Sequence, residues 1–172
     1  SQVESGIRNH ELEFKAGAQN ISPFDEGQYT GEVNGKQIRE FADYVLIGHS
    51  ERRKGFFETK EMLEKKVQMA NKYNIVPLFF IQDEATPISD GVSVVVYEPP
   101  SSISPGIPDT PENANNAAKS VKERLSVKYV LYGGNVTPDN VKGYVQMPYI
   151  DGVLVGRASL DASEFLEIIK NA

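Results

Sequence analysis

The chain of 172 residues contains no cysteine and only two histidines, His10 and His49. The lack of cysteine excludes disulfide bonds, thiolate nucleophiles and thiolate metal sites, and it fits a reducing compartment such as the cytoplasm. With so few histidines as well, a transition-metal site is not expected. The usual nucleotide and dinucleotide motifs, GxxxxGK[ST] and GxGxxG, do not occur either. We therefore expect neither a metal nor another cofactor.

Basic residues and long apolar runs are also scarce. The net charge is -6, from 18 Lys and Arg against 24 Asp and Glu, which disfavours nucleic acid as a partner. No apolar run approaches the roughly 18 residues of a membrane span, and the first residues show no signal-peptide pattern. The length suits one domain covering residues 1–172. The expected protein is soluble, cytoplasmic and not bound to membranes.

Six short apolar runs recur along the chain, each followed by a turn signal and a helical pattern. We predict strands at 14–20, 44–48, 76–81, 92–97, 129–132 and 151–156. Most of these runs are continuous rather than alternating, which is typical of parallel strands buried on both faces. Strands that alternate with helices predict a parallel α/β sheet with right-handed crossovers.

The helices between these strands have readable ends. Residues 60–73 carry an apolar stripe, Leu63, Val67 and Ala70, while Glu61, Glu64, Lys65 and Lys66 are expected to face water. Thr110 and Thr137 each precede a proline, a pattern typical of a capped helix start. Asp161 with Glu164 resembles a capping box that opens the last helix. Between 76–81 and 92–97 only about ten residues remain, too few for a full helix.

His49 comes directly after the apolar run Tyr44–Gly48 and before a block of charge. In parallel α/β folds, ligands bind at the carboxyl ends of the strands, so this position is a candidate for chemistry. Ser50 and Glu51 can begin a helix, whose positive dipole end favours a neutral imidazole that donates a hydrogen bond to a carbonyl oxygen. A scaffold histidine is the competing interpretation, with Arg52 and Arg53 pairing with carboxylates.

Glu98 is the second candidate. It follows the apolar run VSVVVY and precedes the loop PPSSISPG. A carboxylate in a dry site at a strand end can act as a general base. A structural ion pair at the strand end explains the position equally well.

Two glycine-containing turns, YGGNVTPDN at 132–140 and VGRAS at 155–159, follow the last two strands. Backbone amides exposed by Gly133, Gly134 and Gly156 near a helix start can bind a phosphate group. One Gly-Gly pair is weak evidence, because tight turns need glycine for steric reasons. Two such turns on the last strands are stronger evidence, since barrel phosphate sites are commonly built there.

These segments also resemble a known family. YVLIGHSERR, VVYEPPSSISPG, VLYGGNVTPDN and DGVLVGRASLDASEF are similar, in this order, to signature segments of triosephosphate isomerase, and GAQNISPFDEGQYTGEV is similar to its third strand and the following long loop. The resemblance implies a TIM-barrel-like parallel (βα) fold. Because only six strands are recognisable and eight close such a barrel, the barrel is expected to be incomplete or reduced, with the first two βα units lacking.

The resemblance also implies a reaction. A small phosphorylated triose would be the substrate, interconverted between glyceraldehyde 3-phosphate and dihydroxyacetone phosphate in glycolysis and gluconeogenesis. Glu98 would move the proton and His49 would polarise the carbonyl, as the glutamate and neutral histidine of that enzyme do. Supporting residues would be Ser50, Glu51 and Tyr132, and phosphate contacts would come from Ser104, Gly133, Gly134, Asn135 and Gly156. Residues 99–106 would form a lid.

Further implications concern assembly and departures from the family pattern. The loop 22–31, which contains Thr30, would insert into a neighbouring subunit, so a homo-oligomer is expected. Asn135 and Arg157 stand where the family has serine and glycine, and no predicted strand ends in the family's Asn-x-Lys signature, so turnover by this chain alone is expected to be low. A family member without turnover, acting as a phosphate-binding or structural module, and an unrelated doubly wound binding protein remain alternatives.

Overall fold

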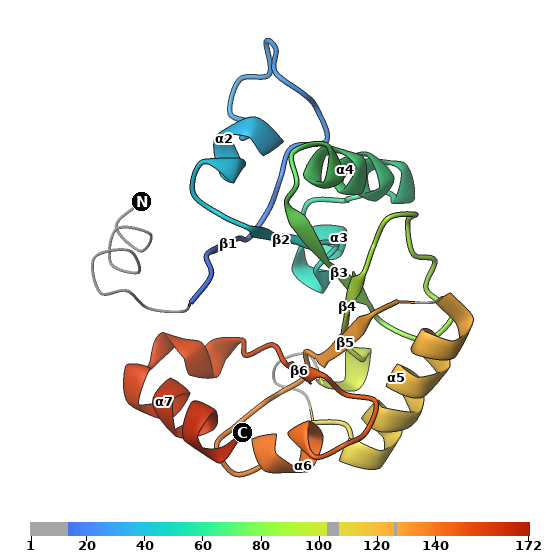
Figure 1. The fold of residues 1–172 in the computed structure, drawn as a ribbon, viewed down its shortest axis with the longest axis vertical. Coiled ribbons are helices and arrows are strands. Elements are labelled where there is room, and N and C mark those ends of the chain that lie inside the picture. Colours follow the sequence, from blue (N-terminus) through green and yellow to red (C-terminus); the bar gives the residue numbers. More distant parts are fainter. Residues whose placement is uncertain (1–13, 103–106, 126) are drawn as a thin grey trace. The chain divides into compact units, whose positions relative to one another are not determined.

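A computed structural model describes residues 14–102, 107–125 and 127–172. The chain divides into two compact units, and each is described by itself. The first contains the residues up to Phe79 together with Ser89–Ser93, and the second contains Phe80–Ile88 together with Val94–Ala172. Strand β3 is shared, because its last two residues belong to the second unit. Figure 1 labels the elements along the chain.

The first unit holds three parallel strands, β1 (Gly17–Ala18), β2 (Tyr44–Ile47) and most of β3 (Val76–Ile81). Gly17 pairs with Tyr44, and Tyr44 pairs with Val76, so the strands lie in chain order. The strands predicted at 14–20 and 44–48 are longer than the observed strands β1 and β2. The run at 14–20 shortens to two paired residues because its other residues make no ladder with β2.

The described residues of the first unit also form three helices: α2 (Gly35–Arg39), α3 (Ser50–Gly55) and α4 (Lys60–Lys72). The Thr59 hydroxyl caps α4 by accepting from the Met62 amide at 3.3 Å. The predicted stripe of Leu63, Val67 and Ala70 is buried. The expectation that Lys66 faces water is wrong, because this residue is 1% exposed.

The second unit contains β4 (Val94–Tyr97), β5 (Tyr129–Tyr132) and β6 (Gly152–Val153). All pairs are parallel, with Val94 opposite Tyr129 and Leu131 opposite Gly152. The strand order β1 to β6 follows the chain, which gives a six-stranded parallel sheet. The runs predicted at 92–97 and 151–156 contain the paired residues but extend beyond them.

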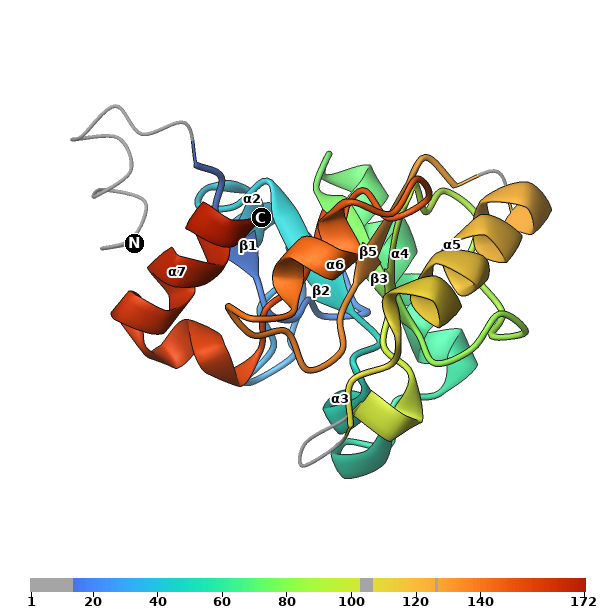
Figure 2. The same cartoon turned by 90° about the horizontal axis from the view of Figure 1, so that it is seen from below.

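Helices α5 (Pro111–Leu125), α6 (Val141–Val145) and α7 (Ala162–Asn171) belong to the second unit, with short 3-10 turns η1 (Pro100–Ser102) and η2 (Arg157–Leu160). Helix α5 contacts β4, β5 and α6, and Figure 2 shows α5 and α6 from below. Its buried face consists of alanines and one valine, which allows a close approach to the strands.

Two of the predicted helix starts are confirmed and one is displaced. Pro111 opens α5, and the Asp161 carboxylate accepts from the Glu164 amide at 2.9 Å at the start of α7. The helix expected from Thr137 begins only at Val141, because the Asn140 side chain holds the preceding turn through the Thr137 amide and the Asn135 carbonyl. No helix in the described part of the chain is long and apolar enough to cross a membrane.

Candidate active site

His49 lies at the carboxyl end of β2, as the N-cap residue of α3. Its Nδ1 accepts a hydrogen bond from the Glu51 amide at 3.2 Å. The Glu51 carboxylate is 3.9 Å from the same nitrogen, but that side chain is 83% exposed and the amide is nearer. Since an amide can only donate, Nδ1 carries no proton here. In a neutral ring the proton then resides on Nε2, and an N–H at that position is the group that can donate to a ligand oxygen.

The turn before His49 depends on Gly48. Its φ is 79°, a left-handed conformation that side chains rarely adopt. A Cβ at this position would lie 2.8 Å from Arg53 Nη2. The Arg53 Nε donates to the Gly48 carbonyl at 2.7 Å, which ties the helix back to the strand end. Arg53 thus supports the turn through a backbone oxygen.

A polar cluster of Arg52, Glu58, Lys66 and Asn20 joins α3 to α4, and Glu58 and Lys66 are its buried members. Glu58 Oε1 accepts from Arg52 Nε at 2.5 Å and also from Lys66 Nζ, and Lys66 Nζ donates to Asn20 Oδ1 at 2.6 Å. Both the Glu58 and the Lys66 side chain are almost fully buried, at 1% and 2% exposed. Burial lowers the pKa of Lys66, and the hydrogen bond that Lys66 donates to Glu58 opposes this shift. The cluster fixes α3, and with it His49, to α4.

The cluster was missed in the sequence. Lys66 occupies the position between Leu63 and Val67 on the apolar stripe, at i+3 from Leu63, so its burial follows the helical period. A lysine on the apolar stripe of a helix indicates a buried charge that needs a partner. One of its partners, Asn20, is 46 residues away in the chain. The partners could not be identified without the tertiary structure.

Glu98 lies in the second unit, directly after β4, and is 6% exposed. Its amide donates to the Ile81 carbonyl at 2.8 Å, which extends the sheet past the end of the strand. The next strand along, β5, is followed directly by Gly133, whose amide donates to the Tyr97 carbonyl at 2.8 Å. A Cβ on Gly133 would lie 2.6 Å from Val96 Cγ1 and 3.8 Å from Glu98 Cβ. The glycine turn is therefore adjacent to the buried carboxyl group.

Gly133 and Gly134 differ in what they can do. The Gly133 amide is engaged by Tyr97, so a phosphate contact from this turn is left to the residues after it. Gly134 is required for packing, because a Cβ there would lie 2.1 Å from the Tyr132 hydroxyl and 2.9 Å from Ser102 Cβ. The Asn135 carbonyl accepts from Asn140 Nδ2 at 2.9 Å, which orders the turn.

Tyr132 is 1% exposed, and its hydroxyl accepts from the Asp109 amide at 3.0 Å. Asp109 lies three residues beyond the segment predicted as a lid. Residues 103–106 of that segment, which include Ser104 and make up half of the predicted lid, lie outside the described residues. The Tyr132 contact is compatible with the supporting role that the resemblance implies.

The second glycine turn is exposed. Gly156 precedes η2, and its carbonyl accepts from the amide and the hydroxyl of Ser159, at 3.0 and 2.7 Å. No heavy atom lies within 4 Å of a Cβ built on Gly156. Arg157, the residue that departs from the family pattern, is exposed beside it. The open space leaves room for a ligand or for a side chain at this turn.

The loop 22–31 begins at the buried Ser22 and Pro23, and most of its remaining residues are exposed. Phe24 and Tyr29 stack with ring centroids 4.3 Å apart, and Gly31 has a φ of 91°. The Asp25 carboxylate accepts from Lys72 and from the Tyr73 hydroxyl at the end of α4. These hydrogen bonds lower the pKa of Asp25 to about 2. Thr30 is exposed at the end of this loop.

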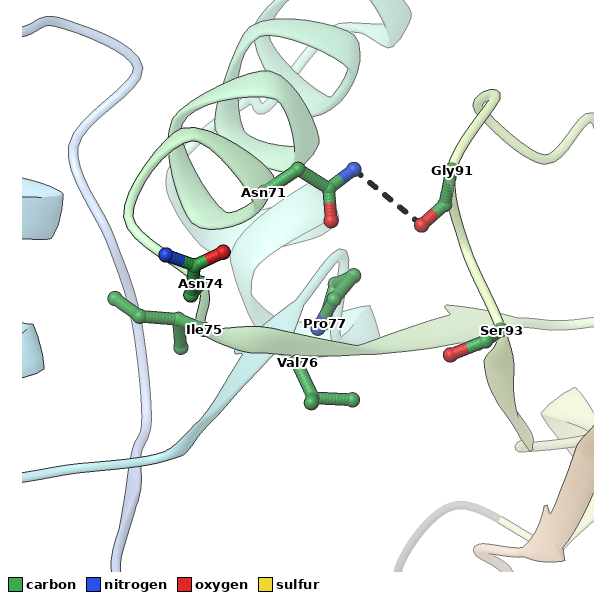
Figure 3. A pocket seen from close by; sticks show the side chains of 7 residues that line it. All are labelled: Asn71, Asn74, Ile75, Val76, Pro77, Gly91 and Ser93. Carbon is green, nitrogen blue, oxygen red and sulfur yellow. Dashed lines mark hydrogen bonds between the residues drawn. The ribbon is translucent and has the colours of Figure 1, made fainter.

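A pocket of about 290 Å³ lies in the first unit at the amino end of β3 (Figure 3). It is lined by Asn71, Asn74, Ile75, Val76, Pro77, Gly91 and Ser93, and Asn71 Nδ2 donates to the Gly91 carbonyl at 3.3 Å. None of these is a candidate site residue. Because β2 and β3 are parallel, the pocket is at the end of the strands opposite His49. We attach no function to it, since ligands of parallel α/β folds bind at the carboxyl ends. Within 14–102, 107–125 and 127–172, no group of three or more His, Cys, Asp or Glu side chains could hold a metal ion.

Comparisons with known proteins decide the family. The family model described as triosephosphate isomerase matches residues 2–90 and 86–172, nearly the whole chain. This chain belongs to the triosephosphate isomerase family. The enzyme of Mesomycoplasma hyopneumoniae strain 232 is 35% identical over 177 residues, covering 90% of this chain and 73% of the relative. That of Herminiimonas arsenicoxydans is 37% identical over 188 residues, covering 91% and 76%.

The fold agrees with this membership. The crystal structure of triosephosphate isomerase from Bartonella henselae superposes with a TM-score of 0.76 and 27% identity, covering 90% of this chain and 75% of that one. The fold is therefore TIM-barrel-like, and with six parallel strands it is an incomplete version of the eight-stranded barrel. The alignment with the Herminiimonas enzyme is longer than this chain, so the relative has internal residues that this chain lacks. The two family matches meet at residues 86–90, in the short connector between β3 and β4, where no helix was expected.

Proposed function

We propose that this member of the triosephosphate isomerase family interconverts glyceraldehyde 3-phosphate and dihydroxyacetone phosphate, with Glu98 as the base that moves the proton. Burial of Glu98 at the carboxyl end of β4, beside the glycine turn 133–134, is the observation that carries the proposal. A carboxylate held out of water has no competing solvent to solvate it, which suits proton transfer from carbon.

His49 is proposed to donate from Nε2 to the carbonyl oxygen of the substrate. The Glu51 amide on Nδ1 supports the neutral ring, because a proton on Nδ1 would repel that amide. Ser50, which is 1% exposed at the first position of α3, and Glu51 support the start of this helix. A fixed donor of this kind stabilises negative charge on the oxygen as the proton leaves carbon.

The phosphate group of the substrate is proposed to bind at the amides of Gly134, Asn135 and Gly156, with Ser104 as the fourth contact. Gly133 shapes this turn, and the Tyr132 hydroxyl, which accepts from the Asp109 amide, supports it by packing against Gly134. Arg157 is close enough in sequence to Gly156 to add a positive charge. No metal or organic cofactor enters this reaction scheme.

The remaining parts of the proposal concern context. The protein is proposed to act in the cytoplasm, in glycolysis and gluconeogenesis, as a single domain and as a homodimer in which Thr30 and the braced loop 22–31 contact the neighbouring subunit. The exposed Phe24 and Tyr29 stack supports this, since aromatic side chains are common at interfaces.

A coupled isomerase assay on the chain and on Glu98→Gln tests the proposal. Loss of a general base costs typically 10²- to 10⁴-fold in rate, so the low turnover that we expect of the chain should fall to background. Glu123→Gln, the same chemical change on the exposed face of α5, serves as the control and should leave the rate unchanged. Equal rates in the chain and in Glu98→Gln would refute the assignment.

The alternative, a family member without turnover, gives a different outcome. In that case the chain shows no isomerase activity, but titration with inorganic phosphate still shifts the amide resonances of Gly134 and Asn135. Absence of both turnover and phosphate binding would contradict both functions.

A further inference from the structure

Three buried or nearly buried hydroxyl groups surround the backbone of Asp109 in the second unit. The Asp109 amide donates to both Ser102 Oγ and the Tyr132 hydroxyl, each at 3.0 Å. The Asp109 carbonyl accepts from the Tyr144 hydroxyl. Tyr144 and Tyr132 are each 1% exposed and Ser102 is 4% exposed. We call Ser102, Asp109, Tyr132 and Tyr144 the hydroxyl cluster.

Each hydroxyl proton of the cluster has an acceptor. Ser102 donates to the Ile107 carbonyl at 3.2 Å, and Tyr132 donates to Ser102 Oγ at 3.4 Å. Tyr144, whose hydroxyl is also 3.4 Å from that of Tyr132, is then left to donate to Asp109. Each hydroxyl has one proton to donate, and this assignment gives each of the three protons its own acceptor. Burial raises the pKa of Tyr144, so its hydroxyl remains a donor across the physiological range.

The cluster contacts the candidate active site at two points. The rings of Tyr132 and Tyr144 stack with centroids 4.0 Å apart and an interplanar angle of 15°, so Tyr144 also sets the position of the Tyr132 ring. Gly134 packs directly on the Tyr132 hydroxyl, where no Cβ fits. On the other side, the Tyr97 hydroxyl reaches Asp109 Oδ2 at 3.5 Å, and Tyr97 immediately precedes Glu98.

We propose that Tyr144 is a positioning residue that acts through Tyr132 to hold the glycine turn 133–134 in the geometry that binds the phosphate group. This inference rests on the proposed function and extends it to a residue on α6. The Tyr144 hydroxyl lies against the Tyr132 hydroxyl and the Asp109 carbonyl. The Tyr144 ring stacks on the Tyr132 ring, and its hydroxyl donates to the Asp109 carbonyl. Both contacts fix the Tyr132 hydroxyl, which accepts from the Asp109 amide and packs against Gly134.

Tyr144→Phe tests the inference, because it removes the hydroxyl and keeps the stacked ring. Tyr129→Phe is the matched control, since Tyr129 is 42% exposed at the other end of β5. Losing one hydrogen bond of this kind is expected to speed hydrogen exchange at the Gly134 and Asp109 amides about fivefold to tenfold. Inorganic phosphate should bind more weakly by a similar factor, and KM for the triose phosphate should rise while kcat stays near that of the unchanged chain.

The outcomes separate this inference from the proposed function. If the chain shows neither turnover nor phosphate binding, the proposed function fails, but the exchange rates at Gly134 still decide whether Tyr144 positions the turn. Exchange rates in Tyr144→Phe that match those of Tyr129→Phe overturn the inference. So does a fall in kcat without a change in KM or in phosphate affinity. Should Tyr144→Phe not fold, Ser102→Ala, which removes the acceptor of the Tyr132 proton, is expected to give the same shifts and is read by the same measures.

Discussion

The candidate residues of the two units are supported by opposite kinds of chemistry. In the first unit, the helix that begins after His49 is supported by charged groups: Arg52 and Lys66 both donate to the same oxygen of the buried Glu58 carboxylate. Beside Glu98, the second unit buries neutral hydroxyls, with Tyr132 and Tyr144 around the Asp109 backbone. Breaking a buried ion pair leaves an uncompensated charge, whereas removing one neutral hydroxyl costs a single hydrogen bond. The first unit should therefore be the more sensitive to single substitutions.

The largest effect is expected from Glu58→Leu. This change leaves the buried Lys66 and the partly exposed Arg52 without their carboxylate, and removing one partner of a buried pair typically costs about 3 to 5 kcal/mol. Denaturant unfolding of the variant measures the loss. Glu64→Gln, in an exposed i,i+4 pair with Lys60 on the same helix, is the control and should change the free energy of unfolding by less than about 0.5 kcal/mol. A Glu58→Leu loss as small as the control would remove the contrast between the units.

The double variant Glu58→Leu with Lys66→Met sharpens the same comparison. Replacing buried ions by apolar side chains of similar size is often neutral, so the double variant should regain part of the stability lost in Glu58→Leu. The free energies of unfolding of the single and double variants are compared under one set of conditions. A double variant less stable than Glu58→Leu would show that Lys66 contributes through packing rather than through its charge.

Phe57→Gly is expected to have a smaller effect than Glu58→Leu and of the opposite sign, an increase in stability. Phe57 has a φ of 54° and is 80% exposed, so burial does not offset its left-handed backbone. The left-handed conformation costs a residue other than glycine roughly 1 to 2 kcal/mol. Glycine avoids this cost, but part of the gain is lost because glycine has more conformational entropy in the unfolded chain. We expect a net gain of about 0.5 to 1 kcal/mol in thermal or denaturant unfolding. Asn74→Gly, also at a φ of 54°, should gain less because asparagine tolerates this region.

Alkaline pH should affect the second unit through Tyr97. Burial, followed by the neighbouring Asp109, raises the pKa of Tyr97 from 10.0 to about 12. The folded state then keeps a proton that the unfolded state has already lost, so the contribution is fully present below pH 10 and is lost as pH rises towards 12. Tyr97→Phe should flatten the fall in stability between pH 10 and 12. An identical pH profile for the variant would contradict the role of Tyr97.

The smallest effect is expected at acid pH in the first unit. The pKa of Asp25 is lowered from 3.8 to about 2 by hydrogen bonds from Lys72 and Tyr73. Its contribution is present above pH 3.8 and is lost as pH falls towards 2, because the carboxylate must then be protonated. Hydrogen exchange of the 22–31 loop amides should accelerate over this window in the unchanged chain. In Asp25→Asn the exchange should already be fast at pH 5 and should lack the acid transition.

Much of the fold could be predicted because its signals are local. The apolar runs contain all six strands, and the Asp161 cap depends only on Glu164, three positions away. The strand ends were less accurate, since ladder pairing with a neighbour decides where a strand stops. The start of α6 was misplaced because the Asn140 side chain takes over the turn that Thr137 and Pro138 were expected to open.

The candidate site divides in the same way. The sequence by itself determined which residues stand at the carboxyl ends of β2, β4 and β5, and it placed His49 at a helix start, because chain order and period are local properties. Only the tertiary structure decided that Lys66 is buried against Asn20 and Glu58, and that Tyr144 reaches Asp109 across 35 residues. Burial of a polar group depends on partners far away in the chain, and no local pattern specifies which of them will come into contact.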